Sequence, residues 1–356
     1  MKKNFFIFLL TAVVLVTTGA GCSWFGNKKS VDISKNGGIY KSTDSGATWL
    51  QITAFPTAKG VGNIGTTKIN TMIIDPQDHA ALYVGTPETG LLFSYNSGAS
   101  WQSPQDTQLQ SGSVTSVAVD YKDMCMFYVA MGSRLYKTET CGRKFIKSYE
   151  ETRSEITAKR VLVDWYNEGV VYLGLSNGDI MKSSDAGATW TKIKSLNKTI
   201  TSMVISNGDS RIILIGTSSG LWRTTDGGAT WLDETDGLEK FKNGENIFKI
   251  VQDKNGSTFL LASEYGLLRS SDGGDNWGSI KLLTSPNQVT VYGLTIDPND
   301  PNIIYYATDD IFYKSIDGGA NWNIQKLTGG WAPSFIYIDS EEPSTLYMGR
   351  QLLEEK

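Results

Sequence analysis

The amino-acid sequence predicts an all-β fold, and more narrowly a seven-bladed β-propeller of four-stranded antiparallel blades. Three observations lead to this prediction. An eight-residue segment recurs seven times along the chain. The aromatic residues that end these segments lie roughly 40–50 residues apart, the period typical of propeller blades. The two ends of the chain carry complementary parts of one repeat, so we expect them to share a blade and close the ring.

The recurring octet is clearest at residues 183–190, which read Ser-Ser-Asp-Ala-Gly-Ala-Thr-Trp. Six copies have an acid or amide at the third position, at Asp44, Asn96, Asp185, Asp226, Asp272 and Asp317. The same six copies end in Trp, at Trp49, Trp101, Trp190, Trp231, Trp277 and Trp322. An Asp or Asn side chain accepts hydrogen bonds from backbone N–H groups a residue or two further on, Gly supplies positive φ, and Trp buries apolar area. Each octet is therefore interpreted as a self-capped turn and not as a reaction centre.

Each repeat has the same order of predicted strands. A strand that ends in Asp, as at residues 71–75, precedes a second strand such as 82–85 and a third such as 220–223. The octet turn then leads to a fourth strand. The N-terminal part begins with a third strand, residues 38–41, and the C-terminal part ends with a first and a second strand, residues 335–339 and 345–349. Pairing these parts removes two exposed edges, so the propeller is expected to span residues 37–350, with 351–356 as a short tail.

The residues before the propeller are interpreted as an export signal and a lipid anchor. Residues 1–21 combine Lys2 and Lys3 with an apolar run that is too short for a membrane span. Small residues precede Cys22, which resembles the bacterial lipobox and makes Cys22 the expected lipidation site. Residues 22–36 are then a polar tether. The alternative is ordinary secretion with an incidental Cys. We expect a lipid-anchored, extracytoplasmic protein of the bacterial cell envelope.

Composition narrows the possible partners. The formal net charge of −4 argues against a nucleic-acid partner. The charged residues at 150–159 are interpreted as a solvated loop. Asp-rich turns such as residues 297–300 lack the ligand spacing of a dedicated calcium loop. We expect a monomer that contains no metal and no other cofactor.

These motifs also carry a family resemblance. The octets resemble the Asp-box, or bacterial neuraminidase repeat. Together with the Asp-Pro turns and the Leu-Tyr-Val-Gly strand at residues 82–85, they are similar to the sortilin-type propeller. They are similar also to the propellers of xyloglucan-active glycoside hydrolases and of the photosystem II assembly factor. The resemblance implies the fold, but these families share blades and differ in chemistry.

Strand order sorts the surface into two faces. Octet turns and Asp-Pro turns share one face, and the second-to-third-strand turns and the connections between blades share the other. Loops on a rigid scaffold commonly bind partners, so we expect a protein or glycan ligand at the face opposite the Asp-box turns. The candidate binding residues there are Trp331, Tyr265, Arg134, Arg160, Arg350, Glu264 and Asp309. Trp331 is either an exposed anchor or a plug between blades, and the arginines either bind an anionic ligand or form ordinary ion pairs.

No catalytic residue is assigned from the sequence. The only histidine, His79, lies in an Asp-Pro turn, where the role of a surface turn residue is favoured over a triad or a metal site. Glycoside hydrolysis needs two carboxylates across a cleft. The carboxylates in turns of the candidate face are Glu88, Asp179, Glu264, Asp309 and Asp310. Acidic turns also serve solubility, so the sequence leaves a catalytic pair open.

Cys125 and Cys141 are predicted to form a disulfide bond. Cys125 opens the second strand of its blade, and Cys141 follows the third strand, inside the one octet that lacks both Asp and Trp. A hairpin turn about residues 132–133 brings the two nearly opposite each other. In an oxidising compartment a disulfide there replaces the missing turn contacts.

The favoured interpretation of function is a membrane-anchored module that binds or assembles proteins and is not an enzyme. The alternative is a carbohydrate-binding protein or a glycoside hydrolase, similar to xyloglucanases or sialidases. The xyloglucan-active enzymes use two propellers that face each other across a cleft, whereas this sequence predicts one. A purely structural envelope protein is a third interpretation.

Overall fold

The computed structural model describes residues 37–327 and 331–352 of the 356-residue chain. The chain divides into two compact units, Met1–Asp32 and Ile33–Lys356, and the fold described below belongs to the second unit. No described helix is long and apolar enough to cross a membrane. The predicted signal, the lipidation site Cys22 and the tether lie outside the described residues.

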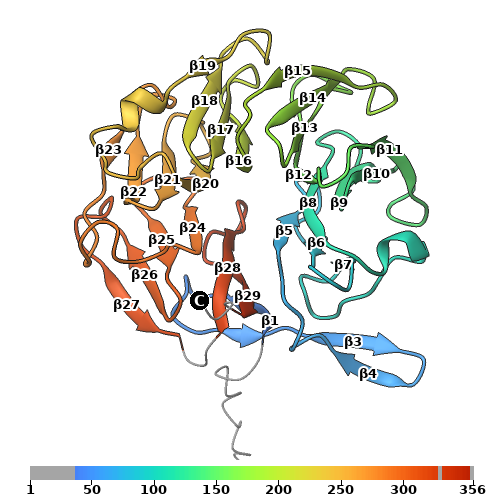
Figure 1. Ribbon diagram of the computed structural model, residues 1–356. Coiled ribbons are helices and arrows are strands. Elements are labelled where there is room, and N and C mark those ends of the chain that lie inside the picture. Colours follow the sequence, from blue (N-terminus) through green and yellow to red (C-terminus); the bar gives the residue numbers. More distant parts are fainter. Residues whose placement is uncertain (1–36, 328–330, 353–356) are drawn as a thin grey trace, which may run out of the picture. The chain divides into compact units, whose positions relative to one another are not determined.

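Seven antiparallel sheets form the blades of a closed ring, which confirms the predicted fold (Figure 1). Each inner strand contacts the inner strands of both neighbouring blades. We number the blades from the one that holds both chain ends. The inner strands of blades 1 to 7 are β28 (Trp331–Ile338), β5 (Thr71–Ile74), β8 (Val114–Val119), β12 (Ala158–Val163), β16 (Ile200–Ile205), β20 (Ile247–Gln252) and β24 (Gly293–Ile296). The second strands, in the same order, are β29 (Leu346–Leu352), β6 (Leu82–Gly85), β9 (Phe127–Met131), β13 (Val171–Leu175), β17 (Ile213–Thr217), β21 (Phe259–Ser263) and β25 (Ile304–Ala307).

The remaining strands complete the blades towards the outside of the ring. The third strands of blades 1 to 7 are β1 (Gly38–Ser42), β7 (Leu91–Ser94), β10 (Arg134–Thr138), β14 (Asp179–Ser183), β18 (Gly220–Thr224), β22 (Gly266–Ser270) and β26 (Ile311–Ser315). The outer strands are β2 (Leu50–Gln51), β11 (Ile146–Glu150), β15 (Thr191–Ser195), β19 (Leu232–Asp233), β23 (Gly278–Ser279) and β27 (Asn323–Lys326). In blade 2 the outer strand is reduced to a single bridge between Phe93 and Gln102. Strands β13, β17 and β21 are buried at every position, because neighbouring blades cover both sides of the sheet.

Blade 1 closes the ring by joining the two ends of the chain. Strand β1 pairs with β29 from Gly38 opposite Arg350 to Ser42 opposite Leu346, and Figure 1 shows β1 in blue beside β28 and β29 in red. This pairing confirms the shared blade. Strand β29 continues to Leu352, so the blade includes two residues that were predicted to belong to the tail.

Among the connections that the structure describes in full, three have regular structure of their own. Strands β3 (Ala54–Thr57) and β4 (Gly60–Asn63) pair as a hairpin in the connection between blades 1 and 2, and Figure 1 shows this hairpin projecting outwards from the ring. The 3-10 helix η2 (Thr107–Leu109) lies between blades 2 and 3, and η3 (Thr235–Leu238) lies between blades 5 and 6.

The octet turns are closed by side-chain hydrogen bonds. Ser183 Oγ accepts from the Gly187 N–H at 2.8 Å and donates to Asp185 Oδ1 at 2.7 Å. The Asp185 carboxylate then accepts from the Thr189 N–H at 2.8 Å and from the Thr189 hydroxyl at 2.6 Å. The sequence placed these acceptor contacts one or two residues after Asp, whereas the structure places them four residues on. The Thr189 hydroxyl, followed by the Thr189 N–H and Ser183, lowers the pKa of Asp185 to about 2.

The octet turns also hold neighbouring blades together. Their fourth residue has left-handed backbone, with φ of 54° at Ala186 and 68° at Gly227. This conformation leaves the carbonyl of the fourth residue facing the preceding blade. There Tyr128 donates to Ala186 O at 3.0 Å, and Tyr172 donates to Gly227 O at 2.9 Å. The equivalent bonds at other joints are Lys41–Ser97, Tyr95–Cys141 and Lys314–Ser45.

The Trp residues that end the octets pack to different depths. Trp101 and Trp277 are buried, with 0% and 4% exposure, whereas the other four are only half-buried. Outer strands lie at the edge of each blade, where a neighbouring blade covers an indole ring on only one of its sides. Most of these Trp side chains therefore stay partly exposed. Trp101 Nε1 donates to Ile52 O of blade 1 at 2.8 Å, and Trp322 Nε1 donates to Lys281 O of blade 6 at 2.9 Å. Trp101 therefore adds a second bond between blades 1 and 2, beside the bond from Lys41 to Ser97 O, and Trp322 bonds blade 7 to blade 6.

The octet of blade 3 keeps its turn with different atoms. The Thr140 hydroxyl accepts from the Lys144 N–H at 3.0 Å, in place of an Asp carboxylate. The structure joins Cys125 and Cys141 by a disulfide, where Cys125 lies in the turn before β9 rather than within the strand. Phe145 takes the place of Trp, with 3% exposure.

We expect the substitution Thr224→Val to destabilise the propeller. The Thr224 side chain is buried, accepts from the Gly228 N–H at 2.9 Å and donates to Asp226 Oδ1 at 2.8 Å. Valine has the same shape but leaves the buried N–H without an acceptor, which costs about 1–3 kcal/mol of unfolding free energy. Denaturant unfolding measures this change. Thr224→Ser, which keeps the hydroxyl, should retain most of the stability, and equal losses in both variants would contradict the prediction.

Candidate functional site

The two faces of the ring differ in how the polar groups of their turns are hydrogen-bonded. The turn between first and second strands lies against the octet turn of the same blade, as in the bond from Ala186 N to Gly169 O at 2.8 Å. The polar groups of the octets are used in such internal bonds. The opposite face carries the turns between second and third strands and the connections between blades, and the inner strands begin there.

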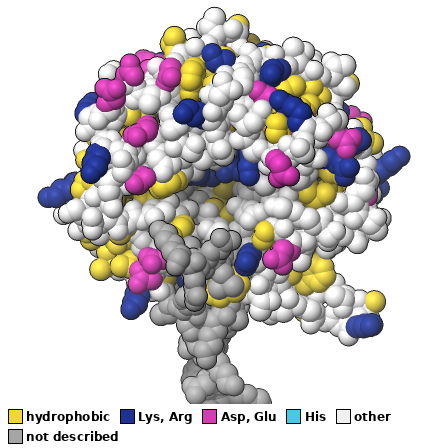
Figure 2. All heavy atoms as spheres, viewed as in Figure 1, with side chains coloured by type: hydrophobic (Ala, Val, Ile, Leu, Met, Phe, Trp, Pro, Cys, Tyr) yellow, Lys and Arg dark blue, Asp and Glu magenta, His cyan; other side chains and the backbone are white. Residues whose placement is uncertain are grey.

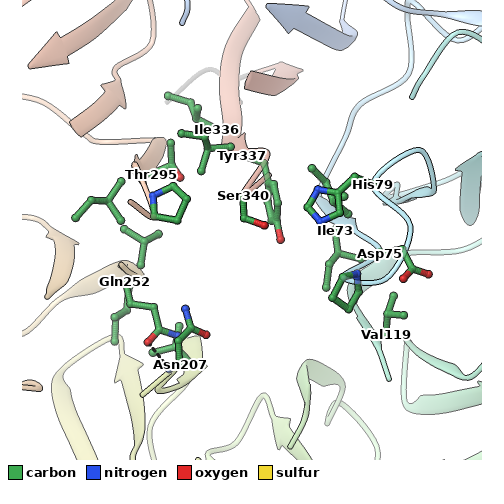
Figure 3. Close-up of a pocket in the computed structure, with 18 of the residues that line it drawn as sticks. Ile73, Asp75, His79, Val119, Asn207, Gln252, Thr295, Ile336, Tyr337 and Ser340 are labelled. Carbon is green, nitrogen blue, oxygen red and sulfur yellow. Dashed lines mark hydrogen bonds between the residues drawn. The ribbon is translucent and has the colours of Figure 1, made fainter. Parts of the chain in front are cut away.

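A channel runs between the inner strands. Its lining includes residues near the octet face, such as Asp75, and residues near the opposite face, such as Asn70. The cavity within it measures about 420 Å³. Figure 2 shows Lys and Arg side chains together with hydrophobic side chains in the central hollow. Figure 3 shows Ile73, Val119, Thr295 and Tyr337 around an open centre. Asn207 and Gln252 also border this centre and are joined by a hydrogen bond from Asn207 N to Gln252 Oε1 at 2.9 Å.

The channel wall is layered, because alternate residues of each inner strand face the same side. The first residue after each inner strand is an Asp, as at Asp164, or in blade 5 a Ser, Ser206. We count positions in each inner strand back from this residue. The residues two positions before it form a mostly apolar layer, namely Ile73, Ala118, Leu162, Val204, Val251, Thr295 and Tyr337. The residues four positions before it lie nearer the face opposite the octets, namely Thr71, Ser116, Arg160, Ser202, Lys249 and Phe335. We call the part of this second layer formed by Arg160, Ser202 and Lys249 the cationic layer.

Arg160 and Lys249 occupy equivalent positions two blades apart, with Ser202 of blade 5 between them. Each follows a register shift in its inner strand. Arg160 Nη1 donates to Thr115 O at 3.2 Å and to Lys159 O at 2.9 Å. Ser202 Oγ accepts from Ile250 N at 3.0 Å. No Asp or Glu lines the 420 Å³ cavity.

The positions of these cations shift their pKa values. The Lys249 side chain is solvent-accessible within the channel, but the channel wall surrounds it and partly desolvates its charge. This desolvation, together with the charge of Arg160, lowers the pKa of Lys249 to about 8. Burial also lowers the pKa of Arg160. The other titratable side chains along the channel are Tyr121, Tyr337 and Tyr292 and, at the end beside the octet face, Asp75 and His79.

Sequence reasoning assigned Arg160 to the candidate face and missed Lys249. The signal was present, since Arg160 lies four residues before Asp164 and Lys249 lies four residues before Asp253. Aligning the blades on the Asp that follows each inner strand would have put both side chains in one layer. An isolated Lys within an apolar strand carries no such signal by itself.

The three candidate arginines lie in three separate environments. Arg134 is half-exposed and its Nε donates to Glu150 Oε1 at 2.8 Å, an ordinary ion pair. Arg160 lies in the channel. Arg350 is 1% exposed, and its guanidinium lies 5.5 Å from the ring centre of Tyr40. The expectation that Arg350 belongs to a binding face is therefore wrong, because its place in β29, between β1 and β28, buries it.

The other candidate binding residues are spread around the ring. Trp331 is half-buried at the start of β28, and a Cβ on Gly37 would lie 2.1 Å from its ring, so the indole packs on this Gly. The Tyr265 ring is 5.2 Å from that of Phe241. Glu264 accepts from Asn243 Nδ2 at 2.8 Å and from Asn246 Nδ2 at 2.9 Å, which orders the connection between blades 5 and 6. Asp309 is exposed in the turn between β25 and β26.

The candidate carboxylates are spread over four blades, and all of them lie in turns except Asp179, which is the first residue of β14. Glu88 lies in blade 2, Asp179 in blade 4, Glu264 in blade 6, and Asp309 and Asp310 in blade 7. Burial raises the pKa of Asp179, but hydrogen bonds from Ser195, Asn177 and Arg153 outweigh it and hold the pKa at about 2. Both Asp179 and Glu264 are thus engaged in structural contacts.

Two predictions about charged side chains are corrected by the structure. Glu151, which was assigned to a solvated loop, is 7% exposed and accepts from Arg153 Nη2 at 2.6 Å, and the same nitrogen donates to Asp179 Oδ2 at 2.8 Å. His79 is only 15% exposed and contacts Asp339 Oδ1 through Nδ1 at 2.5 Å, joining blade 2 to blade 1. Both side chains are buried for the same reason. The closed ring packs neighbouring blades against turns whose polar sequences predict exposure to solvent. Among the described residues, no group of three or more His, Cys, Asp or Glu could hold a metal ion.

Comparison with known proteins supports the fold. The family described as "Photosynthesis system II assembly factor YCF48" matches residues 198–332, which cover blades 5 to 7 and less than half of the chain. A xyloglucanase of Paenibacillus sp. is 24% identical over 81% of this chain and 23% of that protein. The chain spans about a quarter of the length of the curated xyloglucanases that it matches over most of its own length.

Solved structures give the same result. The structure described as "YCF48 bound to D1 peptide" has a TM-score of 0.63 and 14% identity, over 82% of this chain and 94% of that chain. The GH74 xyloglucanase from Xanthomonas campestris has a TM-score of 0.61 and 16% identity, over 80% of this chain and 51% of that chain. At such identities the likeness establishes the fold alone.

We expect Lys249 to lose its proton at an unusually low pH. Its pKa is lowered from 10.5 to about 8, so its neutral, nucleophilic amine should react with succinic anhydride with a midpoint near pH 8. Mass spectrometry of the labelled peptides measures this, with Lys59 at the tip of the β3–β4 hairpin as the exposed reference. Arg160→Leu removes a repelling charge and should move the midpoint upwards. Labelling of Lys249 that begins only near pH 10 would contradict the prediction.

Proposed function

We propose that this protein is a lipid-anchored, extracytoplasmic propeller that binds a segment of another protein and is not an enzyme. Its binding site is the face opposite the Asp-box turns. The observation that carries this proposal is the unequal use of polar groups on the two faces. The octet face uses its carboxylates and carbonyls in bonds such as Thr189–Asp185 and Tyr128–Ala186, whereas the opposite face exposes residues such as Glu88 and Asp309 on its turns.

The comparisons are consistent with protein binding. One solved structure of the same fold is described as YCF48 bound to a D1 peptide. In this chain the channel opens onto the proposed face, and the turns around its mouth form a rim that a bound segment can contact. Side chains on the rim, including the half-buried Trp331 and Tyr265, provide apolar contact area of the kind that anchors partners at interfaces.

A carbohydrate-active protein is the second candidate. The observation in its favour is the similarity to a Paenibacillus xyloglucanase over 81% of this chain. A cavity of about 430 Å³ lined by Phe248, Glu264 and Asn287 also lies on the proposed face. Against hydrolysis, Glu264 is held by two asparagine side chains, and no carboxylate lines the cationic layer. The match covers only 51% of the chain of the GH74 enzyme.

Site-specific photocrosslinking tests the proposed face. A photoreactive amino acid at Glu88 or Asp309, both exposed on the proposed face, should crosslink in intact cells to the same partner protein. The matched positions Thr43 and Thr225 are exposed on octet turns and should give no crosslink to that partner. Crosslinks from the octet positions alone would overturn the choice of face. Release of reducing sugar from xyloglucan by the purified protein, abolished in Trp331→Ala, would favour the carbohydrate-active candidate instead.

We expect Cys22→Ser to release the protein from the membrane. The proposed anchor rests on the small residues before Cys22, which resemble a lipobox. Metabolic labelling with a palmitate analogue should mark the wild-type protein and leave the variant unmarked, and membrane fractionation should show the same difference. A wild-type protein that is secreted without label would contradict the anchor while leaving the proposed binding face untouched.

A further inference from the structure

The cationic layer of the channel contains two positive charges and no negative charge. Arg160 and Lys249 both line the 420 Å³ cavity, and none of its lining residues is Asp or Glu. The two cations are near enough that the charge of Arg160 contributes to lowering the pKa of Lys249. The side chain of Lys249 is open to the channel and that of Arg160 is half-buried, and no carboxylate of this cavity balances either charge. A cavity lined by charges of one sign attracts a counter-ion, so these two cations favour the binding of an anion.

The donors of this layer are oriented but not saturated. Two carbonyl oxygens, Thr115 O and Lys159 O, hold Arg160 Nη1. These contacts fix the guanidinium plane and leave its charge uncompensated. Within residues 37–327 and 331–352, Nε and Nη2 of Arg160 and Nζ of Lys249 donate to no protein acceptor. An anion between the two side chains would receive hydrogen bonds from both and would turn their repulsion into attraction.

We propose that the cationic layer binds the phosphate group of a small ligand, either inorganic phosphate or a phosphate monoester. A phosphate dianion balances two positive charges, whereas a single carboxylate balances one. The Arg fork and the Lys point charge are the two side-chain types that bind phosphate best. The apolar layer of Leu162, Val204 and Val251 lies directly below on the same strands, and its low polarity strengthens the attraction.

The mouth of the channel fits this ligand as well. On the face opposite the octets, Asn70, Tyr292 and Ser334 line the same cavity, and they can hydrogen-bond to the non-phosphate part of a monoester. Lys249 also lines the adjoining cavity, which reaches Asp75 and His79 at the octet end. We place ligand entry at the face opposite the octets, because no carboxylate lines the cavity on that side. This site lies inside the channel and does not depend on the proposed protein partner, which would contact the rim.

Calorimetric titration of the full-length protein in detergent tests the proposal. The probes are inorganic phosphate and glycerol 3-phosphate, with succinate and chloride as comparison anions. We expect saturable binding of at least one phosphate compound at millimolar concentration or below. Tighter binding of glycerol 3-phosphate would identify a monoester as the ligand, and equal binding would identify the phosphate group alone. Succinate that binds as tightly as phosphate would overturn the choice of phosphate.

Variants of the two cations separate binding from folding. Lys249→Met and Arg160→Gln should each weaken phosphate binding about 10-fold to 100-fold, Lys249→Arg should restore it, and Lys59→Gln on the hairpin should have no effect. Because Lys249→Met removes a charge that repels Arg160, its thermal stability without phosphate should equal or exceed that of the wild type. Absence of phosphate binding at 10-fold above millimolar concentration, or full binding in the double variant, would overturn the proposal. Either result would leave the crosslinking experiment on the rim unaffected.

Discussion

The fold depends on one repeated constraint, the octet turn whose fourth residue is left-handed. A side chain in this conformation costs about 1 kcal/mol, and Ala186 accepts that cost with φ of 54°. The Ser183 and Asp185 bonds hold the turn in place. The carbonyl of Ala186 is thereby presented to Tyr128 of the preceding blade. The octet is therefore a joint between blades as well as a cap within one.

This contact between blades explains why the octet face has a structural role and leaves the opposite face available for binding. Carboxylates of the octets are committed to local hydrogen bonds, so their negative charge is already stabilised and their pKa values lie near 2, as at Asp185 and Asp226. On the face opposite them, a hydroxyl closes the turn between second and third strands in some blades, as Thr217 does to Gly220 O and Thr308 to Ile311 O, while the connections between blades differ in length and sequence. Variation there changes the surface without loosening the ring, which is the arrangement that loops on rigid scaffolds use for binding.

The channel is the other consequence of a closed ring. The seven inner strands place equivalent residues at the same depth along the channel. The residue at one position of each blade therefore determines the charge and polarity of one layer of the channel wall. In blades 3 and 5 the position is a small Ser, which bonds to the backbone of the next blade, as Ser202 does to Ile250 N. In blades 4 and 6 the same position is Arg160 or Lys249, and the channel gains charge at this depth.

The sequence by itself determined what is local and repeated: the seven octets, the order of strands in a blade, and the pairing of β1 with β29 that completes blade 1. Turn chemistry and alternation act over a few residues, so they can be read without the fold. Tertiary structure alone decided which side chains meet across blades. It buried Arg350 beside Tyr40, joined His79 to Asp339, and brought Lys249 to the level of Arg160. The two residues of each pair are between about 90 and 310 positions apart in the chain, and the arrangement of the blades around one ring brings them near each other.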